Sequence, residues 1–192
     1  MHSPIPDPGS PSPLGSLDYG GDLPHPSDPV GRSVREFFAN NWTEARDGLL
    51  ARTTLIDVTP LHGEVPRSFS FAIDRPYRRR QPSGSIILDP GPVEGVICYH
   101  ASVLRPPPDV RPVVVFISSA GFHHPNVGRK HHVLCLGDVP LRLPLDALLQ
   151  HLYGVVAYQN LGFNPPLDPE AARYFLTNPA AFEGLRPVPP LY

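Results

Sequence analysis

The sequence is short of cysteine, lysine and long apolar runs, and the shortages exclude several classes of protein. Two cysteines in 192 residues are too few for a disulfide framework, so we expect a reducing, cytoplasmic setting. No apolar run approaches the ~20 residues of a membrane-spanning helix. The first residues show no basic stretch followed by an apolar one, so no secretory signal is expected. Lys130 is the single lysine among sixteen basic residues, a bias typical of a GC-rich genome.

An excess of charge is also lacking. The formal net charge is −2 at pH 7, so no global basic surface is available to hold nucleic acid or an anionic membrane, and neither partner is expected. Proline, in contrast, is abundant at 28 residues. Each proline removes a backbone donor and fixes φ, which excludes a long-helix or coiled-coil protein.

Residues 1–31 are predicted to be a disordered tail, and residues 32–192 one domain. The tail holds eight prolines, five glycines and five serines but few large apolar residues. Such a segment cannot bury enough surface to offset the entropy lost on ordering. The remaining residues are enough for one core, and no internal repeat is visible.

Hydrophobic periodicity predicts helices at both ends of the domain. Ser33 and Glu36 have capping-box spacing and open a helix through residue 50 with one apolar face. Pro144 begins a second helix with a leucine-rich stripe. Asp168 and Pro169 are a suitable N-cap and first residue for a third helix, up to residue 176.

Four strands are predicted between the first and second helices. They cover residues 53–58, 67–73, 93–104 and 113–118, where β-branched, alternating or continuous apolar residues prevail. Residues 74–92, with three consecutive arginines at 78–80, are predicted as a solvated loop that a short strand at 86–88 interrupts. This order is typical of an α+β fold, a four-stranded antiparallel meander with helices packed on one face.

The long loop before the second helix carries the chemistry. It contains His124-Pro125-Asn126 and, nine residues after the asparagine, Cys135. A thiolate is nucleophilic and suits the transient carriage of an acyl group. Attack on a thioester builds negative charge on oxygen, which a neutral amide such as Asn126 can stabilise. The loop is short enough to bring the two residues together if it folds back.

These residues resemble the ubiquitin-conjugating enzyme (UBC) family. Its members carry His-Pro-Asn and, about eight residues later, a cysteine, often within Cys-Leu, as in Cys135-Leu136. The strand, proline-rich turn and strand at residues 98–116 are similar to the segment preceding that motif. The Gly-Pro and Glu-Gly steps of residues 91–95 and the Pro-Leu segment at 166–174 are also similar. The resemblance covers roughly residues 32–180, in the family's order.

The resemblance implies a UBC-like fold and a conjugating activity without a cofactor. Cys135 would accept a ubiquitin-like protein from an activating enzyme as a thioester and pass it to an amine of a protein target. Asn126 would stabilise the oxyanion or the loop itself. His124 and Pro125 would order the active-site loop. Asn164 stands where the family has an acidic residue that helps position the incoming lysine.

Some positions depart from the family's pattern. Gly137 replaces the aspartate that many eukaryotic members have two residues after the cysteine, and the tryptophan usual shortly after the cysteine is missing. Asn164 lacks the charge that lysine-directed members use. These departures and the arginine-rich composition suggest a bacterial branch, similar to members from ubiquitin-like conjugation operons implicated in antiphage defence.

Two other functions remain open. The chain resembles the catalytically inactive UBC-fold binding modules as well, although those usually lose the cysteine. An unrelated thiol hydrolase would need a histidine base beside Cys135, and His123 and His132 are candidates. Cys98 lies within a strand pattern and is expected to be an inert thiol.

The remaining polar residues of the loop have simpler interpretations. Its four histidines and Cys135 are zinc-ligand types, but adjacent histidines point in different directions and no second ligand pair follows, so no metal is expected. Arg129 and Lys130 either lower the pKa of the Cys135 thiol or face solvent and a partner.

Overall fold

The computed structural model describes residues 22–61, 63–137, 140, 142–159, 161 and 165–185. Its order of elements is α+β, with an N-terminal helix, an antiparallel sheet and C-terminal helices, as the sequence predicts. Among the described helices, none has the length and apolarity needed to cross a bilayer. The helices are α1 (Pro29–Asp47), η1 (Leu50–Arg52), α2 (Leu145–Val156), α3 (Pro169–Thr177) and η2 (Pro179–Phe182).

The first helix begins earlier than predicted. Asp28 is its N-cap, because the carboxylate accepts a hydrogen bond from the Val30 amide (2.9 Å), and Pro29 occupies the first turn. Ser33, predicted as the cap, lies inside α1 and donates its hydroxyl to the Pro29 carbonyl (3.1 Å). The predicted boundary at residue 31 therefore falls within α1, while residues 1–21 of the predicted tail lie outside the described residues.

The main sheet has five strands in the order β1-β2-β5-β6-β7, each antiparallel to its neighbour. Its first four members are the predicted meander, with adjusted ends. The fifth strand, at residues 133–134, lies in the segment predicted as the long loop before the second helix. The strand predicted at 93–104 ends at Tyr99, after which the chain turns. The strands are β1 (Ile56–Pro60), β2 (Ser68–Ile73), β5 (Val93–Tyr99), β6 (Val113–Ile117) and β7 (Val133–Leu134).

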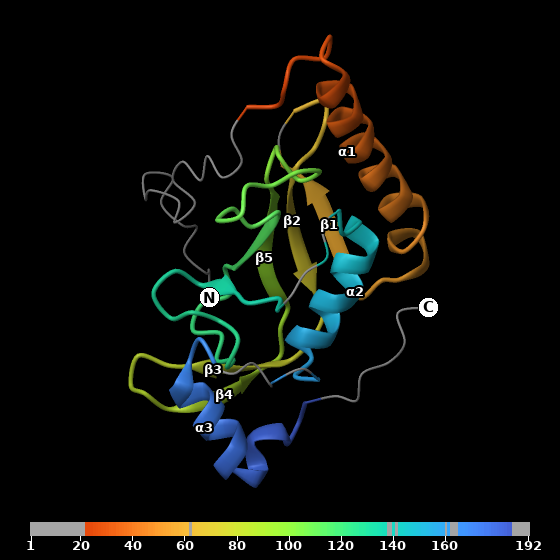
Figure 1. Ribbon diagram of the computed structural model, residues 1–192. Helices are drawn as coiled ribbons and strands as arrows, with labels where there is room; N and C mark the ends of the chain where they lie inside the picture. The colour runs from red at the N-terminus through yellow and green to blue at the C-terminus, as the bar shows by residue number, and fades with distance from the viewer. Residues whose placement is uncertain are drawn as a thin grey trace, which may run out of the picture.

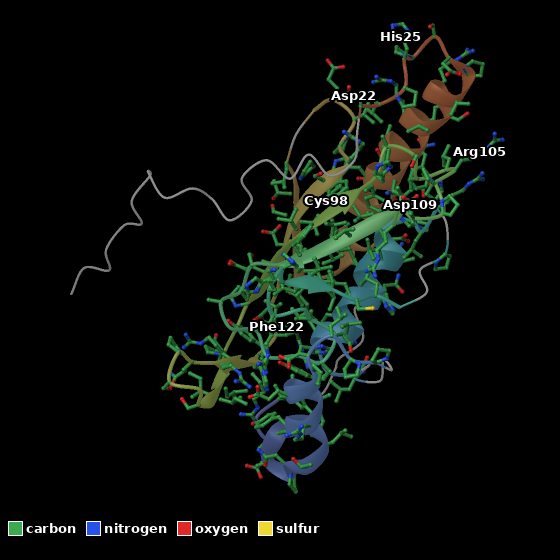
Figure 2. All side chains as sticks on the ribbon, turned by 60° about the vertical axis from the view of Figure 1, so that its left-hand side comes forward. Asp22, His25, Cys98, Arg105, Asp109 and Phe122 are labelled. Atoms are coloured by element: carbon green, nitrogen blue, oxygen red, sulfur yellow. The ribbon has the colours of Figure 1, made fainter. Side chains whose placement is uncertain are left out.

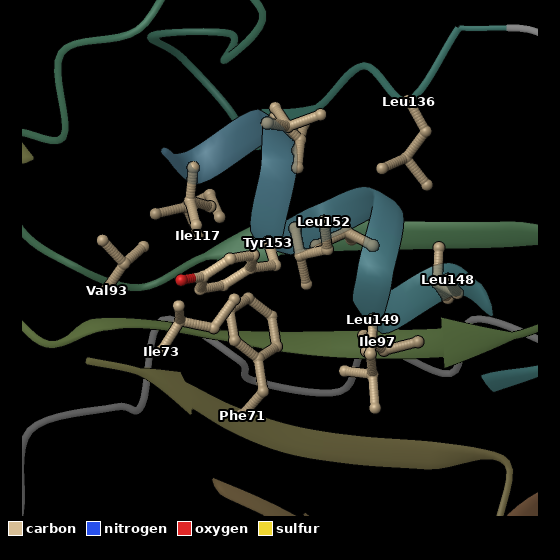
Figure 3. Close-up of a cluster of buried hydrophobic side chains, with 14 of the residues drawn as sticks. Phe71, Ile73, Val93, Ile97, Ile117, Leu136, Leu148, Leu149, Leu152 and Tyr153 are labelled. Carbon is tan, nitrogen blue, oxygen red and sulfur yellow. The ribbon is translucent and has the colours of Figure 1, made fainter. Parts of the chain in front are cut away.

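The core lies between one face of this sheet and the helices α1 and α2. Figure 1 shows both helices on the same side of the sheet. Alternate residues of β2 face this layer, so Phe69, Phe71 and Ile73 are buried as the sequence pattern predicts. Leu149 and Leu152 of α2 pack against them, as Figure 3 shows. This packing fixes α2 on the sheet, and the candidate site is built against His151 and Val155 of α2.

The segment after β2 is not the predicted solvated loop, although the short strand predicted at residues 86–88 is confirmed. The segment forms a two-stranded hairpin of β3 (Tyr77–Arg80) and β4 (Ile86–Asp89). Arg78 is buried, and its guanidinium donates hydrogen bonds to the carbonyls of Ala180, Ala181 and Glu183. Figure 1 shows the hairpin beside α3, at the end of the molecule away from the N-terminus of α1. Arg78 thus joins the hairpin to η2.

We predict that Arg78→Met lowers the free energy of unfolding by about 3 kcal/mol, since it removes one buried and two partly buried hydrogen bonds from a charged donor. Arg79→Met is the matched control on the next residue, because Arg79 forms only a partly exposed ion pair with Asp89 (2.8 Å), which contributes less than about 1 kcal/mol. Urea unfolding of both variants measures the difference. Equal losses in the two variants would contradict the structural role of Arg78.

Candidate active site

His124-Pro125-Asn126 forms a buried turn that contacts three separate parts of the chain. The Val127 amide donates to the His124 carbonyl (3.1 Å), which closes the turn. The Pro125 carbonyl accepts from the Asp168 amide (2.9 Å), and the Asn126 carbonyl accepts from the Cys135 amide (2.7 Å). The tripeptide therefore connects the start of α3 to the segment that carries the thiol.

The imidazole of His124 is fixed in one tautomer. The Asn126 amide donates to Nδ1 (3.1 Å), so Nδ1 is an acceptor and the proton sits on Nε2. Nε2–H donates to the carbonyl of Val155 near the end of α2 (3.0 Å). Burial lowers the pKa of His124 to about 3, so the ring is neutral at physiological pH and acts as a structural link.

An aromatic cluster surrounds this imidazole. The His124 ring lies nearly parallel to Phe122, with centroids 5.7 Å apart, and 5.0 Å from the ring of Tyr158. The Tyr158 hydroxyl accepts from the Arg78 amide (2.8 Å) and donates to the His123 carbonyl (3.3 Å). Figure 2 places Phe122 between the five-stranded sheet and the end formed by β3, β4 and α3. The cluster therefore joins the motif to both parts of the molecule.

Cys135 follows β7 and is a half-buried, free thiol. Its own amide donates to Asn126, and the carbonyl of the next residue, Leu136, accepts from Nε2 of His151 on α2 (3.0 Å). The backbone is thus held on both sides of the thiol. The predicted fold-back of the loop, which brings Asn126 and Cys135 together, is confirmed. The Asn126 side chain itself is fully buried.

A group of ion pairs fixes the turn after the motif to α3. Arg129 donates to Asp168 (2.7 Å) and to Glu170 (2.6 Å), and Arg80 of β3 also pairs with Glu170. Asp168 is the predicted N-cap of α3, with its Oδ1 accepting from the amides of Glu170 and Ala171. The guanidinium of Arg129 is thus paired with two carboxylates. Lys130 is exposed.

The other predicted residues have separate positions. Asn164 lies outside the described residues. Cys98 is buried in β5, where Figure 2 labels it, and burial raises the pKa of its thiol. His123 packs its ring against Tyr174 and Phe175 of α3, and His132 is exposed in the turn before β7. In the described part of the chain, no hydrogen bond joins a histidine side chain to the Cys135 thiol.

Among the described residues, no three His, Cys, Asp or Glu side chains are grouped as metal ligands. The sequence did not predict the roles of Tyr158 and His151. Tyr158 bonds to a residue 35 positions earlier and His151 to one 15 positions earlier, and nothing in the local sequence marks either residue as a partner of the loop. In comparisons with known proteins, no protein-family model and no curated protein matches the chain.

We predict that the protein loses stability as the pH falls from 7 to 5. The folded-state pKa of His124 is below its ordinary value of about 6.5, so the unfolded chain binds more protons in this range. His124 alone then lowers the free energy of unfolding by about 2 kcal/mol at pH 5. His123, whose pKa burial and the charge of Arg80 lower to about 4, adds to the loss.

Urea unfolding at both pH values measures the effect. His124→Gln should be less stable than wild type at pH 7. The loss of unfolding free energy between pH 7 and pH 5 should be smaller in this variant by the about 2 kcal/mol that His124 contributes. The acidic residues of the site do not obscure the result, since the pKa of Glu170 lies at about 2, held there by its bonds to Arg80 and Arg129. An unchanged pH difference in His124→Gln would show that the ring is not held neutral.

Proposed function

We propose that this protein is a ubiquitin-like protein conjugating enzyme with a UBC-like fold, in which Cys135 carries the modifier as a thioester. One observation carries the proposal: the Cys135 amide is hydrogen-bonded to the carbonyl of Asn126 (2.7 Å), so the thiol and the His-Pro-Asn turn are neighbours. A half-exposed thiol beside an amide-bearing turn suits acyl transfer better than it suits packing.

The reaction follows from the chemistry of the thiol. The Cys135 thiolate attacks the thioester carbonyl of a modifier held on an activating enzyme, and the enzyme's thiol leaves. An amine of a protein target then attacks the new thioester, loses a proton and releases Cys135. Each attack builds an oxyanion. Asn126 either stabilises that charge or maintains the turn, and these two roles predict different kinetics.

The order of elements is compatible with the proposed UBC-like fold. An N-terminal helix, a meander of neighbouring strands and a helix packed across the sheet precede α3. The β3–β4 hairpin lies within the connection between two strands of the meander, β2 and β5, and is an addition to that arrangement. Partners on this proposal are an activating enzyme, a ubiquitin-like protein and a protein target.

We predict that Cys135 alone forms the thioester. Incubation with the cognate activating enzyme, ATP and the ubiquitin-like protein should give a band on a non-reducing gel that disappears with reductant. Cys135→Ser should give a stable oxyester and Cys135→Ala no adduct, whereas Cys98→Ala, the control at the buried thiol, should load normally. A reductant-sensitive adduct in Cys135→Ala would contradict the assignment. No adduct with any variant would favour the inactive binding module.

Asn126 is predicted to matter more for transfer than for loading. If its amide stabilises the oxyanion, Asn126→Ala should keep the thioester but slow its discharge to free amines by roughly 10²–10³-fold. Because Asn126 is fully buried, Asn126→Asp serves as the isosteric comparison that retains the volume and lacks the amide donor. Single-turnover discharge assays measure both. Unchanged discharge together with a lower melting temperature would assign Asn126 to the order of the turn alone.

A further inference from the structure

A hollow of about 470 Å³ lies between the β3–β4 hairpin, the segment that leads into the His-Pro-Asn turn and the start of α3. Arginine and histidine side chains from three segments line it: Arg79, Arg80, His123, Arg129 and His132. Among the described lining residues, Asp168 is the only acid. The thioester mechanism proposed above uses none of these basic groups.

Three side-chain nitrogen atoms of these residues lack a hydrogen-bond partner within the described structure. His123 is only 2% exposed, yet its Nε2 has no partner. The buried Nε atoms of Arg79 and Arg80 have no hydrogen-bond partner either, although Arg79 Nε lies 2.8 Å from Asp89 in an ion pair. Buried polar atoms in folded proteins are nearly always satisfied by protein, water or a ligand. Unsatisfied nitrogens in two neighbouring walls of one hollow therefore indicate that an acceptor belongs between them.

The charges around the hollow favour an anionic acceptor. Arg79 pairs with Asp89 and Arg80 with Glu170, but neither acid lines the hollow. Each guanidinium has five N–H donors, so these pairs leave further donors unused. The positive potential is also felt by His123, because the charge of Arg80 adds to burial in lowering its pKa.

We propose that this hollow binds a phosphoryl group, held by Arg79, Arg80 and the Nε2–H of His123. A guanidinium matches two oxygens of a phosphate with parallel hydrogen bonds, and two guanidiniums with an imidazole donor suit a tetrahedral dianion better than a planar carboxylate. The volume leaves room for the remainder of a larger phosphorylated molecule. Since His123 directly precedes the His-Pro-Asn turn, an occupied hollow also braces the segment that leads to the thiol.

The test is a titration of the full chain with inorganic phosphate at constant ionic strength, followed by NMR of the histidine rings. The His123 resonances should shift saturably, and its pKa should rise from about 4 because the anion stabilises the imidazolium. Arg79→Gln and Arg80→Gln should each weaken binding about tenfold or more. Arg173→Gln, on the exposed side of α3 and outside the hollow, should bind as wild type does.

Cys135→Ala should bind phosphate unchanged, which separates this site from the thioester chemistry. Pyrophosphate should bind more tightly than phosphate if the hollow takes a larger phosphorylated molecule, and equally if it takes the free ion. Three results would overturn the proposal: no saturable shift of His123 in the wild-type protein, binding retained in both arginine variants, or an equal response to acetate at the same ionic strength.

Discussion

The two hydrogen bonds of the His124 imidazole order the His-Pro-Asn turn and fix it to α2. One nitrogen accepts from the Asn126 amide and the other donates to Val155 at the end of α2. With both nitrogens committed and the ring fully buried, the turn has one conformation relative to α2. The Asn126 carbonyl then positions Cys135, so the location of the thiol follows from the tautomer of a histidine in a different segment.

Much of this architecture can be predicted from the sequence, because strand alternation and helix capping depend on residues that are close together in the chain. The alternation of Phe69, Phe71 and Ile73 gives a strand with one buried face, and Asp168-Pro169 gives the start of α3. The sequence predicts the start of α1 too late, because the chain has two possible N-caps for this helix. Asp28-Pro29 prevails over Ser33 and Glu36, although it lies within a proline-rich composition that predicted disorder.

Other features depend on contacts between distant residues, which periodicity does not encode. Three consecutive arginines indicate a solvated loop, yet Arg78 is buried because η2, about a hundred residues later, presents carbonyls that need donors. The hydrogen bonds from Tyr158 to the His123 carbonyl and from His151 to the Leu136 carbonyl also join residues that are distant in the sequence. The spacing of Asn126 and Cys135 could predict their encounter only because the intervening turn is short.

The His-Pro-Asn turn is bonded at once to Val155 near the end of α2 and to Asp168 at the start of α3. The connection between these helices is therefore anchored at both ends by the same tripeptide. The entropy of closing a loop depends only weakly on its length. Tyr158, packed against the His124 ring, is a further fixed point of this connection, so a change in its length after Tyr158 should cost little and leave the thiol in place.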